Sequence, residues 1–102
     1  MSGSQAPRDA AATLSLRLYV AGNAPNSAAA LANLAKLFPG SEANGPAVAI
    51  EVVDLLHEPS RGLVDGVVVS PTLVRLAPAP VRRIVGDLSD HQAVLLALGV
   101  PP

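Results

Sequence analysis

Two strand-like segments on either side of one helix-like segment constrain the fold of this chain more than any other feature. Apolar residues alternate with other residues across residues 14–20 and again across residues 48–52, which predicts two strands with one buried face each. The second strand continues into the apolar Val53. A strand, a helix and a strand in this order favour a parallel strand pair joined by a right-handed crossover.

The segment between these strands has the spacing of an amphipathic helix. The predicted apolar stripe has helical periodicity and comprises Leu31, Leu34, Ala35 and Phe38. Pro25 suits the first turn of this helix, and we expect the side chain of Asn23 or Asn26 to cap it. Pro39 and Gly40 predict that the helix ends sharply.

The second half of the chain begins with a segment that favours little regular structure. Proline and glycine interrupt residues 54–66, so we expect only a short helix there, starting at Glu58 or Pro59. Residues 72–76 and 81–85 predict two strands joined by the proline-rich residues 77–80. Strands that follow each other closely favour an antiparallel pair.

The end of the chain has the signals of a closing helix. Ser89 and Gln92 form a capping-box pattern, and Asp90 is expected in the first turn, where a negative charge favours the helix dipole. Gly99 is well placed to end the helix. The predicted order is therefore β-α-β-(α)-β-β-α, the thioredoxin-like topology of the α/β class.

Length and composition indicate one domain. The 102 residues suffice for one hydrophobic core and are too few for two, so we assign residues 13–102 to a single domain. Residues 1–12 are small and polar, and we expect a disordered tail. The net charge of −1 gives no basic field for nucleic acid. No apolar run predicts a membrane span or a secretory signal, so we expect a cytoplasmic protein.

The residue types argue against an enzyme. The chain has no cysteine, which excludes disulfides, thiolate metal sites and dithiol redox chemistry. His57 and His91 lack the partners of a zinc site and are expected on the surface. No serine elbow and no glycine-rich phosphate loop occurs. We therefore expect no catalysis, no cofactor and no metal.

Two places remain as candidates for binding, each with a structural alternative, and a third position, Pro71, concerns the backbone between them. The Asn23-Ala24-Pro25-Asn26 loop stands where thioredoxin-like folds carry their dithiol, and it is either a binding edge or a helix cap. Pro71 precedes a strand at the point where that topology favours a cis-proline. Arg75, Arg82 and Arg83 belong to the last two strands, and they are either a solvated sheet edge or a docking surface for an acidic partner.

Several segments, in the same order, match one family. The segments are RLYVAGNAPNS at residues 17–27, SPTL at 70–73 and PVRRIVGDLSD at 80–90, with a looser match at 53–56. They resemble the KaiB family, small bacterial clock proteins that bind the ring-shaped ATPase KaiC, and the resemblance runs from about residue 14 to residue 98. The sensor domain of the clock histidine kinase SasA has a similar fold but lacks the GDLSD stretch at residues 86–90.

The resemblance implies a non-enzymatic regulator of a KaiC-like ATPase. A KaiA-like protein and a SasA-like histidine kinase are further candidate partners. With the resemblance, we expect partner binding at Asn23, Pro25 and Asn26 at the helix entry and at the three arginines named above. The arginines lie in the half of the chain that faces the partner in KaiB-family proteins. The alternative function is a redox-inactive thioredoxin-like sensor or binding module for another signalling protein.

The resemblance also implies two folds. Family members form a tetramer in a ground state whose C-terminal half is folded differently, and they become thioredoxin-like monomers when bound. We expect Pro71 and Gly86 to serve the fold. Relatives usually have Gly-Leu-Asp where this chain has Ala97-Leu98-Gly99. Alanine favours a helix over glycine by about 0.8–1 kcal/mol, so we expect the thioredoxin-like fold as the resting state, as a monomer or weak dimer.

Overall fold

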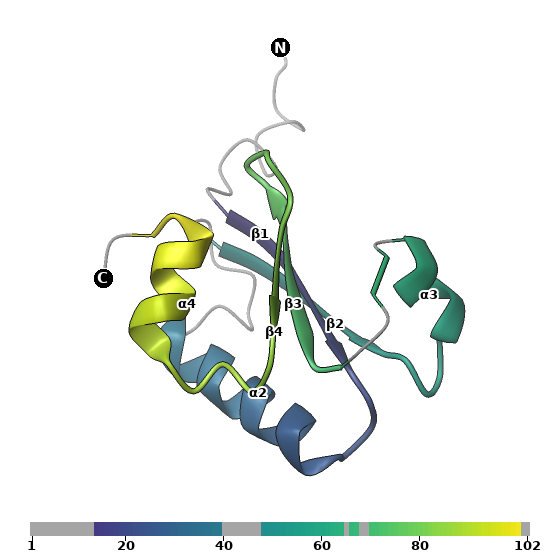
Figure 1. Ribbon diagram of the computed structural model, residues 1–102. Coiled ribbons are helices and arrows are strands. Elements are labelled where there is room, and N and C mark those ends of the chain that lie inside the picture. The colour runs from purple at the N-terminus through teal and green to yellow at the C-terminus, as the bar shows by residue number, and fades with distance from the viewer. Residues whose placement is uncertain (1–13, 40–47, 65, 68–69, 101–102) are drawn as a thin grey trace.

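The computed structural model describes residues 14–39, 48–64, 66–67 and 70–100 of the chain (Figure 1). The expected tail at residues 1–12 lies outside this part. The elements, in chain order, are β1 (Leu14–Val20), α2 (Pro25–Leu37), β2 (Val48–Asp54), α3 (Pro59–Val64), β3 (Thr72–Ala77), β4 (Arg82–Val85) and α4 (His91–Leu98). The predicted order of elements is confirmed, including the start of the short helix α3 at Pro59.

One mixed sheet organises the protein. The strand order is β2-β1-β3-β4, with β1 parallel to β2 and antiparallel to β3, and with β4 antiparallel to β3. Helices α2 and α4 cover one face of the sheet, and α3 lies on the other side (Figure 1). This arrangement is the thioredoxin-like topology that the sequence predicts. We call the two sides of the sheet the α2/α4 face and the α3 face.

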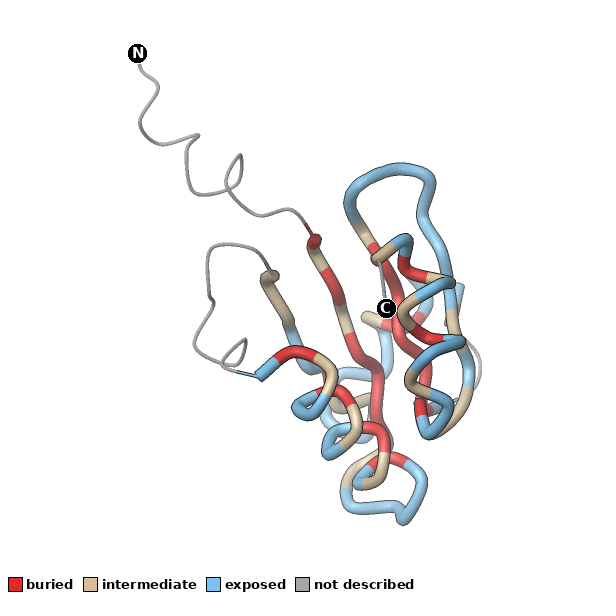
Figure 2. The backbone as a smooth tube through the Cα atoms, turned by 90° about the vertical axis from the view of Figure 1, so that its left-hand side faces the viewer, coloured by how far each residue is buried: buried red, intermediate tan, exposed pale blue. Residues whose placement is uncertain are grey.

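The main core lies between the sheet and the α2/α4 face. Its strand residues come from the alternating positions of β1 and from β3, and residues in or next to α2 and α4 cover them on one face, toward the viewer in Figure 2. The buried residues are Leu14, Leu16, Leu18, Val20, Ala30, Leu34, Phe38, Leu73, Leu88, Val94 and Leu98. This core is almost entirely aliphatic, as the composition requires.

A smaller cluster on the α3 face holds α3 against the sheet. It consists of Tyr19, Val53, Val67 and Val74. The Tyr19 hydroxyl donates to the Arg61 carbonyl of α3 at 3.0 Å. The Arg61 guanidinium in turn pairs with Glu51 of β2 at 2.7 Å, and this contact, followed by that with Arg17, holds the pKa of Glu51 below its ordinary value.

The predicted stripe of α2 is wrong in part. Leu34 and Phe38 are buried, but Leu31 is 38% exposed and Ala35 is exposed. The helix instead buries Ser27, Ala30 and Leu34, so its contact face is rotated toward small residues. Small side chains let the start of α2 approach the sheet closely, which a hydrophobicity pattern does not register.

Two predictions about helix caps are also wrong. The N-cap of α2 is Ala24, and no side chain caps this helix, so neither Asn23 nor Asn26 does so. The N-cap of α4 is Asp90 rather than Ser89, and its carboxylate accepts from the Ala93 N–H at 3.1 Å.

The predictions for two special backbone positions, Pro71 and Gly99, are confirmed. The Ser70–Pro71 peptide is cis, as are the peptides before Pro78 and Pro80. Gly99 ends α4 in the left-handed conformation with φ 77°, and its N–H bonds carbonyls of the last turn.

Candidate functional site

Hydrogen bonds on its inner side fix the backbone of the loop between β1 and α2, and the tip of the loop faces outward. The Ala21 N–H donates to the hydroxyl of the buried Ser27 at 3.0 Å, and the Ala24 N–H donates to the Ala21 carbonyl at 3.1 Å. Gly22 has φ 55°, and a Cβ at this position would lie 2.8 Å from the Leu56 side chain. Only glycine fits this turn without rearrangement.

Asp54, the last residue of β2, fixes the same loop from the neighbouring strand. One carboxylate oxygen accepts from the Gly22 N–H at 3.0 Å and from the Leu56 N–H at 2.9 Å. The backbone N–H groups of Leu56 and then Gly22 hold the pKa of Asp54 below its usual value of 3.8. The ionised carboxylate therefore organises the turn that precedes α2.

Acidification should loosen this loop. Because the pKa of Asp54 is lower in the folded chain than in the unfolded chain, its stabilising contribution is present above about pH 4 and is lost as the pH falls through the folded-state pKa. An NMR titration should show the Gly22 and Leu56 amides moving together with a midpoint below 3.8. An Asp54→Asn variant should lack this transition. A midpoint above 3.8 would contradict the contact.

The predicted binding residues of the loop lie on the surface. Asn23, Pro25 and Asn26 are all exposed. Neither asparagine caps α2 with its side chain, but the loop contains the N-cap residue Ala24 and the first helical residue Pro25, so the structural alternative also stands. Their placement is compatible with a binding edge, which stays a prediction.

Pro71 and Gly86 lie at the same end of the sheet as this loop. The Gly86 N–H donates to the Pro71 carbonyl at 3.0 Å, directly beyond the last β3–β4 pair, Thr72 and Val85. Pro71 is buried, and Gly86 has φ 127°, a conformation that L side chains rarely adopt. This contact accords with the expected structural role of both residues.

The start of α4 is tied to α2 through a polar contact that the sequence does not indicate. Asn33 of α2 donates to the Asp87 carbonyl at 2.8 Å, and its side-chain oxygen lies 3.1 Å from Nε2 of His91. His91 is partly buried here, so the expectation of a plain surface histidine is wrong for it, whereas His57 is exposed. Asn33 thus helps to orient α4 against α2.

Arg75 does not belong to an exposed arginine surface. It is only 6% exposed, and its guanidinium donates to the Leu98 carbonyl and to the Pro80 carbonyl, each at 2.8 Å. Its Nε is buried without a partner. The prediction that three arginines form one exposed cluster is therefore wrong for Arg75. This residue instead connects β3 to the end of α4 and to the hairpin loop.

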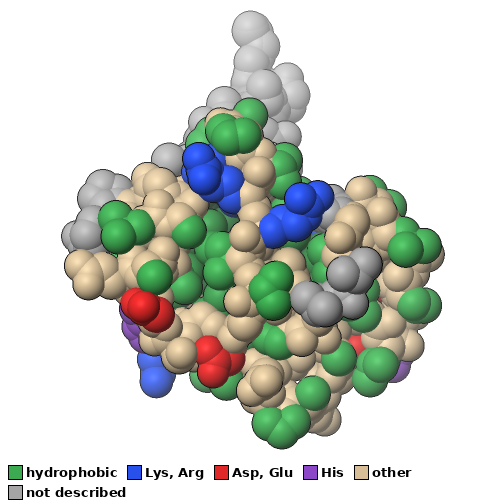
Figure 3. Space-filling model, viewed as in Figure 1, with side chains coloured by type: hydrophobic (Ala, Val, Ile, Leu, Met, Phe, Trp, Pro, Cys, Tyr) green, Lys and Arg blue, Asp and Glu red, His purple; other side chains and the backbone are tan. Residues whose placement is uncertain are grey.

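Arg82 and Arg83 are exposed, but their side chains leave β4 on opposite sides. Arg82 is the cross-strand neighbour of Arg75, and Arg83 is that of Val74, which belongs to the α3-face cluster. Figure 3, which faces the free edge of β4, shows two groups of basic side chains on either side of this edge. Across the sheet, Arg83 lies beside Val74 of β3, and Val74 lies beside Arg17 of β1. Arg17 is roughly 13 Å along the chain from Ala21, so Arg83 is well separated from the loop after β1.

The remaining described residues give no sign of metal chemistry or of a membrane span. No three His, Asp or Glu side chains among them gather as a metal site would require. Within the same part of the chain, no helix has the length and apolar composition that crossing a bilayer requires.

Comparison with known proteins decides the family. The family model described as the KaiB domain matches residues 17–100. The chain belongs to the KaiB family. A relative named circadian clock oscillator protein KaiB from Prochlorococcus marinus (strain MIT 9312) is 45% identical over 86 residues, which cover 84% of this chain and 80% of the relative. The KaiB of Synechococcus sp. (strain RCC307) is also 45% identical, over 84% of this chain and 76% of its own length.

Solved structures agree on the fold. The N-terminal domain of SasA from Synechococcus elongatus has a TM-score of 0.66 at 26% identity, and the match covers 93% of this KaiB-family chain and 90% of that domain. Chloroplastic thioredoxin z has a TM-score of 0.67 at 19% identity, covering 95% and 88% of the two chains, which shows likeness of fold alone. The family resemblance and the thioredoxin-like fold are both confirmed.

Several residues that shape the site of this KaiB-family chain escape sequence reasoning. Asn33 and Asp54 bond groups far along the chain, and Ser27 bonds the backbone N–H of Ala21 across the turn before α2. The only local signal is that Asp54 ends a strand, where a carboxylate often meets a turn. Such contacts depend on which segments the fold brings together, so a single sequence does not specify them.

Proposed function

We propose that this chain is a non-enzymatic regulator that binds a KaiC-type ATPase ring and modulates its phosphorylation or ATPase cycle. The observation that carries the proposal is the KaiB-domain match over residues 17–100. The absence of cysteine from the sequence supports the non-enzymatic part, since a thioredoxin-like fold without thiols has no thiol–disulfide exchange. The cytoplasm is the compartment that we expect for such a pair.

Two exposed regions support a docking surface for this role. One is the loop with Asn23, Pro25 and Asn26, whose backbone is fixed by internal bonds and whose tip is exposed. The other is the β4 edge with Arg82 and Arg83. We leave Arg75 out of the docking surface because it is buried. A rigid loop costs little conformational entropy on binding, which favours its use as a contact.

The proposal is tested by capture of the purified KaiC-like ATPase from the same organism. The full chain is immobilised and offered the ring with ATP, with ADP and without nucleotide. We expect saturable capture in at least one nucleotide state and a changed ATPase rate of the ring. Capture in no state would refute the proposal.

Charge reversal on β4 should weaken this capture. The double variant Arg82→Glu/Arg83→Glu should bind the ring at least about ten-fold more weakly, because two attractive contacts become repulsive. Lys36→Glu, which reverses one exposed charge on α2, is the control for charge reversal away from β4 and should bind like the parent. Equal losses in both variants would mean that net charge, and not the β4 edge, determines binding.

We further propose that the thioredoxin-like arrangement is the resting state of this chain, in a monomer or weak dimer. Ala97 lies inside α4 and Gly99 ends it with the left-handed conformation that glycine adopts at no steric cost. Both residues favour the helix over a strand at this place in the sequence. The family's tetrameric ground-state fold is the alternative.

A second candidate function is a binding module for a histidine-kinase signalling partner. The likeness to the N-terminal domain of SasA favours it. The same capture experiment distinguishes the two functions when the kinase and the ATPase ring are offered in parallel. Retention of the kinase alone would favour this second function.

A further inference from the structure

The outer edge of β4 has features of a strand-binding site. β4 is the last strand in the sheet order, and no strand lies beyond it among the residues that the structure describes. The Gly86 N–H points inward to Pro71, and backbone direction alternates along an antiparallel strand. The backbone groups of Arg83 and Val85 therefore face outward, while those of Ile84 face β3.

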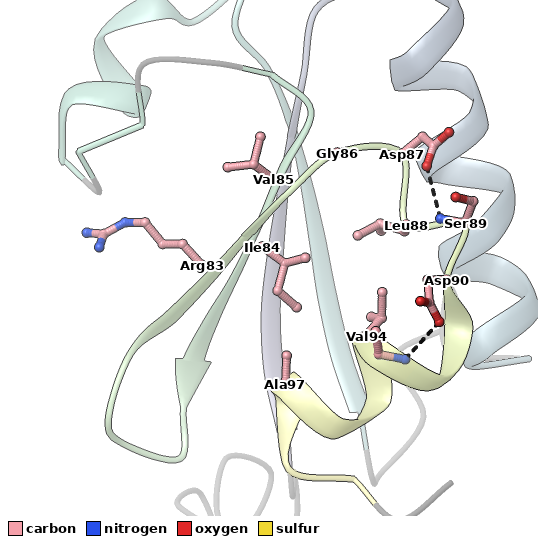
Figure 4. A pocket seen from close by; sticks show the side chains of 11 residues that line it. Arg83, Ile84, Val85, Gly86, Asp87, Leu88, Ser89, Asp90, Val94 and Ala97 are labelled. Carbon is pink, nitrogen blue, oxygen red and sulfur yellow. Dashed lines mark hydrogen bonds between the residues drawn. The ribbon is translucent and has the colours of Figure 1, made fainter.

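A shallow hollow of about 440 Å³ lies beside this edge on the α2/α4 face. Ile84 of β4, Leu88, and Val94 and Ala97 of α4 surround it with apolar groups (Figure 4). Arg83 points away from the hollow, toward the α3 face (Figure 4). A side chain entering the hollow from a neighbouring strand would thus meet aliphatic walls.

Charge is distributed unevenly along the same edge. Arg82 and Arg83 stand at one end, and Asp87 and Asp90 line the other end of the hollow. Strands β3 and β4 contain no acidic residue. Arg82 makes no side-chain hydrogen bond or ion pair with the described part of the chain. A bound strand should therefore carry acidic groups at one end and a basic group at the other.

We propose that the β4 edge binds an extended peptide segment of a partner protein by strand addition, with two adjacent acidic residues opposite Arg82 and Arg83. Neighbouring residues of an added strand point to opposite sheet faces, as Arg82 and Arg83 do. An acidic pair therefore matches both arginines at once. The next residue lies opposite Ile84 and places an apolar side chain in the hollow.

The direction of the added strand fixes the order of these residues along the peptide. In an antiparallel strand, which forms the more stable pairing, the residue opposite Gly86 precedes the apolar residue and lies near Asp87 and Asp90. The order from the N-terminus is then basic, any residue, apolar, acidic, acidic. This inference deepens the docking role proposed above for Arg82 and Arg83, and it names the kind of segment that docks.

A labelled peptide tests the site without the ATPase ring. The probe is an acetylated Lys-Thr-Val-Glu-Glu-Thr peptide with a fluorescent label, added to the full-length protein. We expect saturable binding by fluorescence anisotropy and slower hydrogen exchange of the Arg83 and Val85 amides. Replacing both glutamates of the peptide with glutamine should weaken binding about ten-fold, and more so at low salt.

A proline substitution separates strand addition from surface charge. Val85→Pro removes an outward N–H that β3 does not use, and should weaken binding about three- to ten-fold, the effect of one backbone hydrogen bond. Val85→Ala keeps the N–H and should bind within about two-fold of the parent. Both variants are first checked for folding by their backbone NMR spectra. If Val85→Pro does not fold, a probe N-methylated opposite Val85 removes the same bond from the peptide side.

Three results would overturn the inference. These are no binding of the probe, equal binding to Val85→Pro and Val85→Ala, and amide protection on β2 instead of β4. In the first case the arginines only protect the edge from aggregation. The ATPase ring is absent from the peptide assay, so failure of peptide binding would leave the proposal of ring binding unaffected. If the peptide bound but the ring were not captured, only the identity of the partner would be refuted.

Discussion

Replacing Leu98 with alanine should lower the free energy of unfolding by about 3 kcal/mol, the usual cost of truncating a fully buried leucine. Leu98 is 1% exposed and packs into the main core from the last turn of α4. The surrounding core is aliphatic and closely packed, so it is expected to relax only partly around the cavity. Urea unfolding followed by circular dichroism measures the change.

Leu96 provides a matched control within the same helix. It is 63% exposed, so Leu96→Ala should change the stability by less than about 0.5 kcal/mol. The pair of variants also tests the resting fold, because only the thioredoxin-like arrangement distinguishes the two leucines in this way. Similar costs for both, together with strand-like backbone chemical shifts across residues 93–98 of the free protein, would show that the ground-state fold predominates.

Replacing Arg75 with methionine should cost about 2 kcal/mol and should loosen α4 in particular. Methionine keeps most of the buried stem but removes the donors to the Leu98 and Pro80 carbonyls. Each bond from a charged donor contributes about 1.5–3 kcal/mol, and relief from burying a charge offsets part of the sum. Hydrogen exchange should accelerate in α4 more than in β1.

Arg82→Met is the control for this prediction. Arg82 is the exposed cross-strand neighbour of Arg75, so the same chemical change there should cost less than about 0.5 kcal/mol. If Arg75→Met matched this small effect, the guanidinium would not be holding the end of α4. Uniform acceleration of exchange over all elements would indicate general destabilisation instead.

The sequence predicted most elements because their signals are local. The alternation in β1, the Pro25 start of α2 and the Gly99 end of α4 each depend on a few neighbouring residues, and the structure confirms all three. Helix caps were less predictable. Ser89 and Asp90 are both good N-cap residues, and the choice between them depends on where the chain leaves β4.

The arginines show the limit of sequence reasoning most clearly. Arg75, Arg82 and Arg83 are alike as residues on two neighbouring strands, yet one is buried and the other two point to opposite faces. Strand alternation explains the difference between Arg82 and Arg83. The burial of Arg75 could not be predicted without knowing that α4 ends beside β3. At that end the Leu98 carbonyl needs a hydrogen-bond donor, which Arg75 supplies.

The amino-acid sequence by itself determined the order of strands and helices, the thioredoxin-like topology, the exclusion of thiol chemistry and the family, because periodicity, residue type and short motifs lie within the chain. Only the tertiary structure decided which polar side chains are exposed, which face of α2 is buried and which edge of the sheet is open. Those properties arise from contacts between segments that lie far apart in the chain, such as Asn33 with His91 and Asp54 with Gly22.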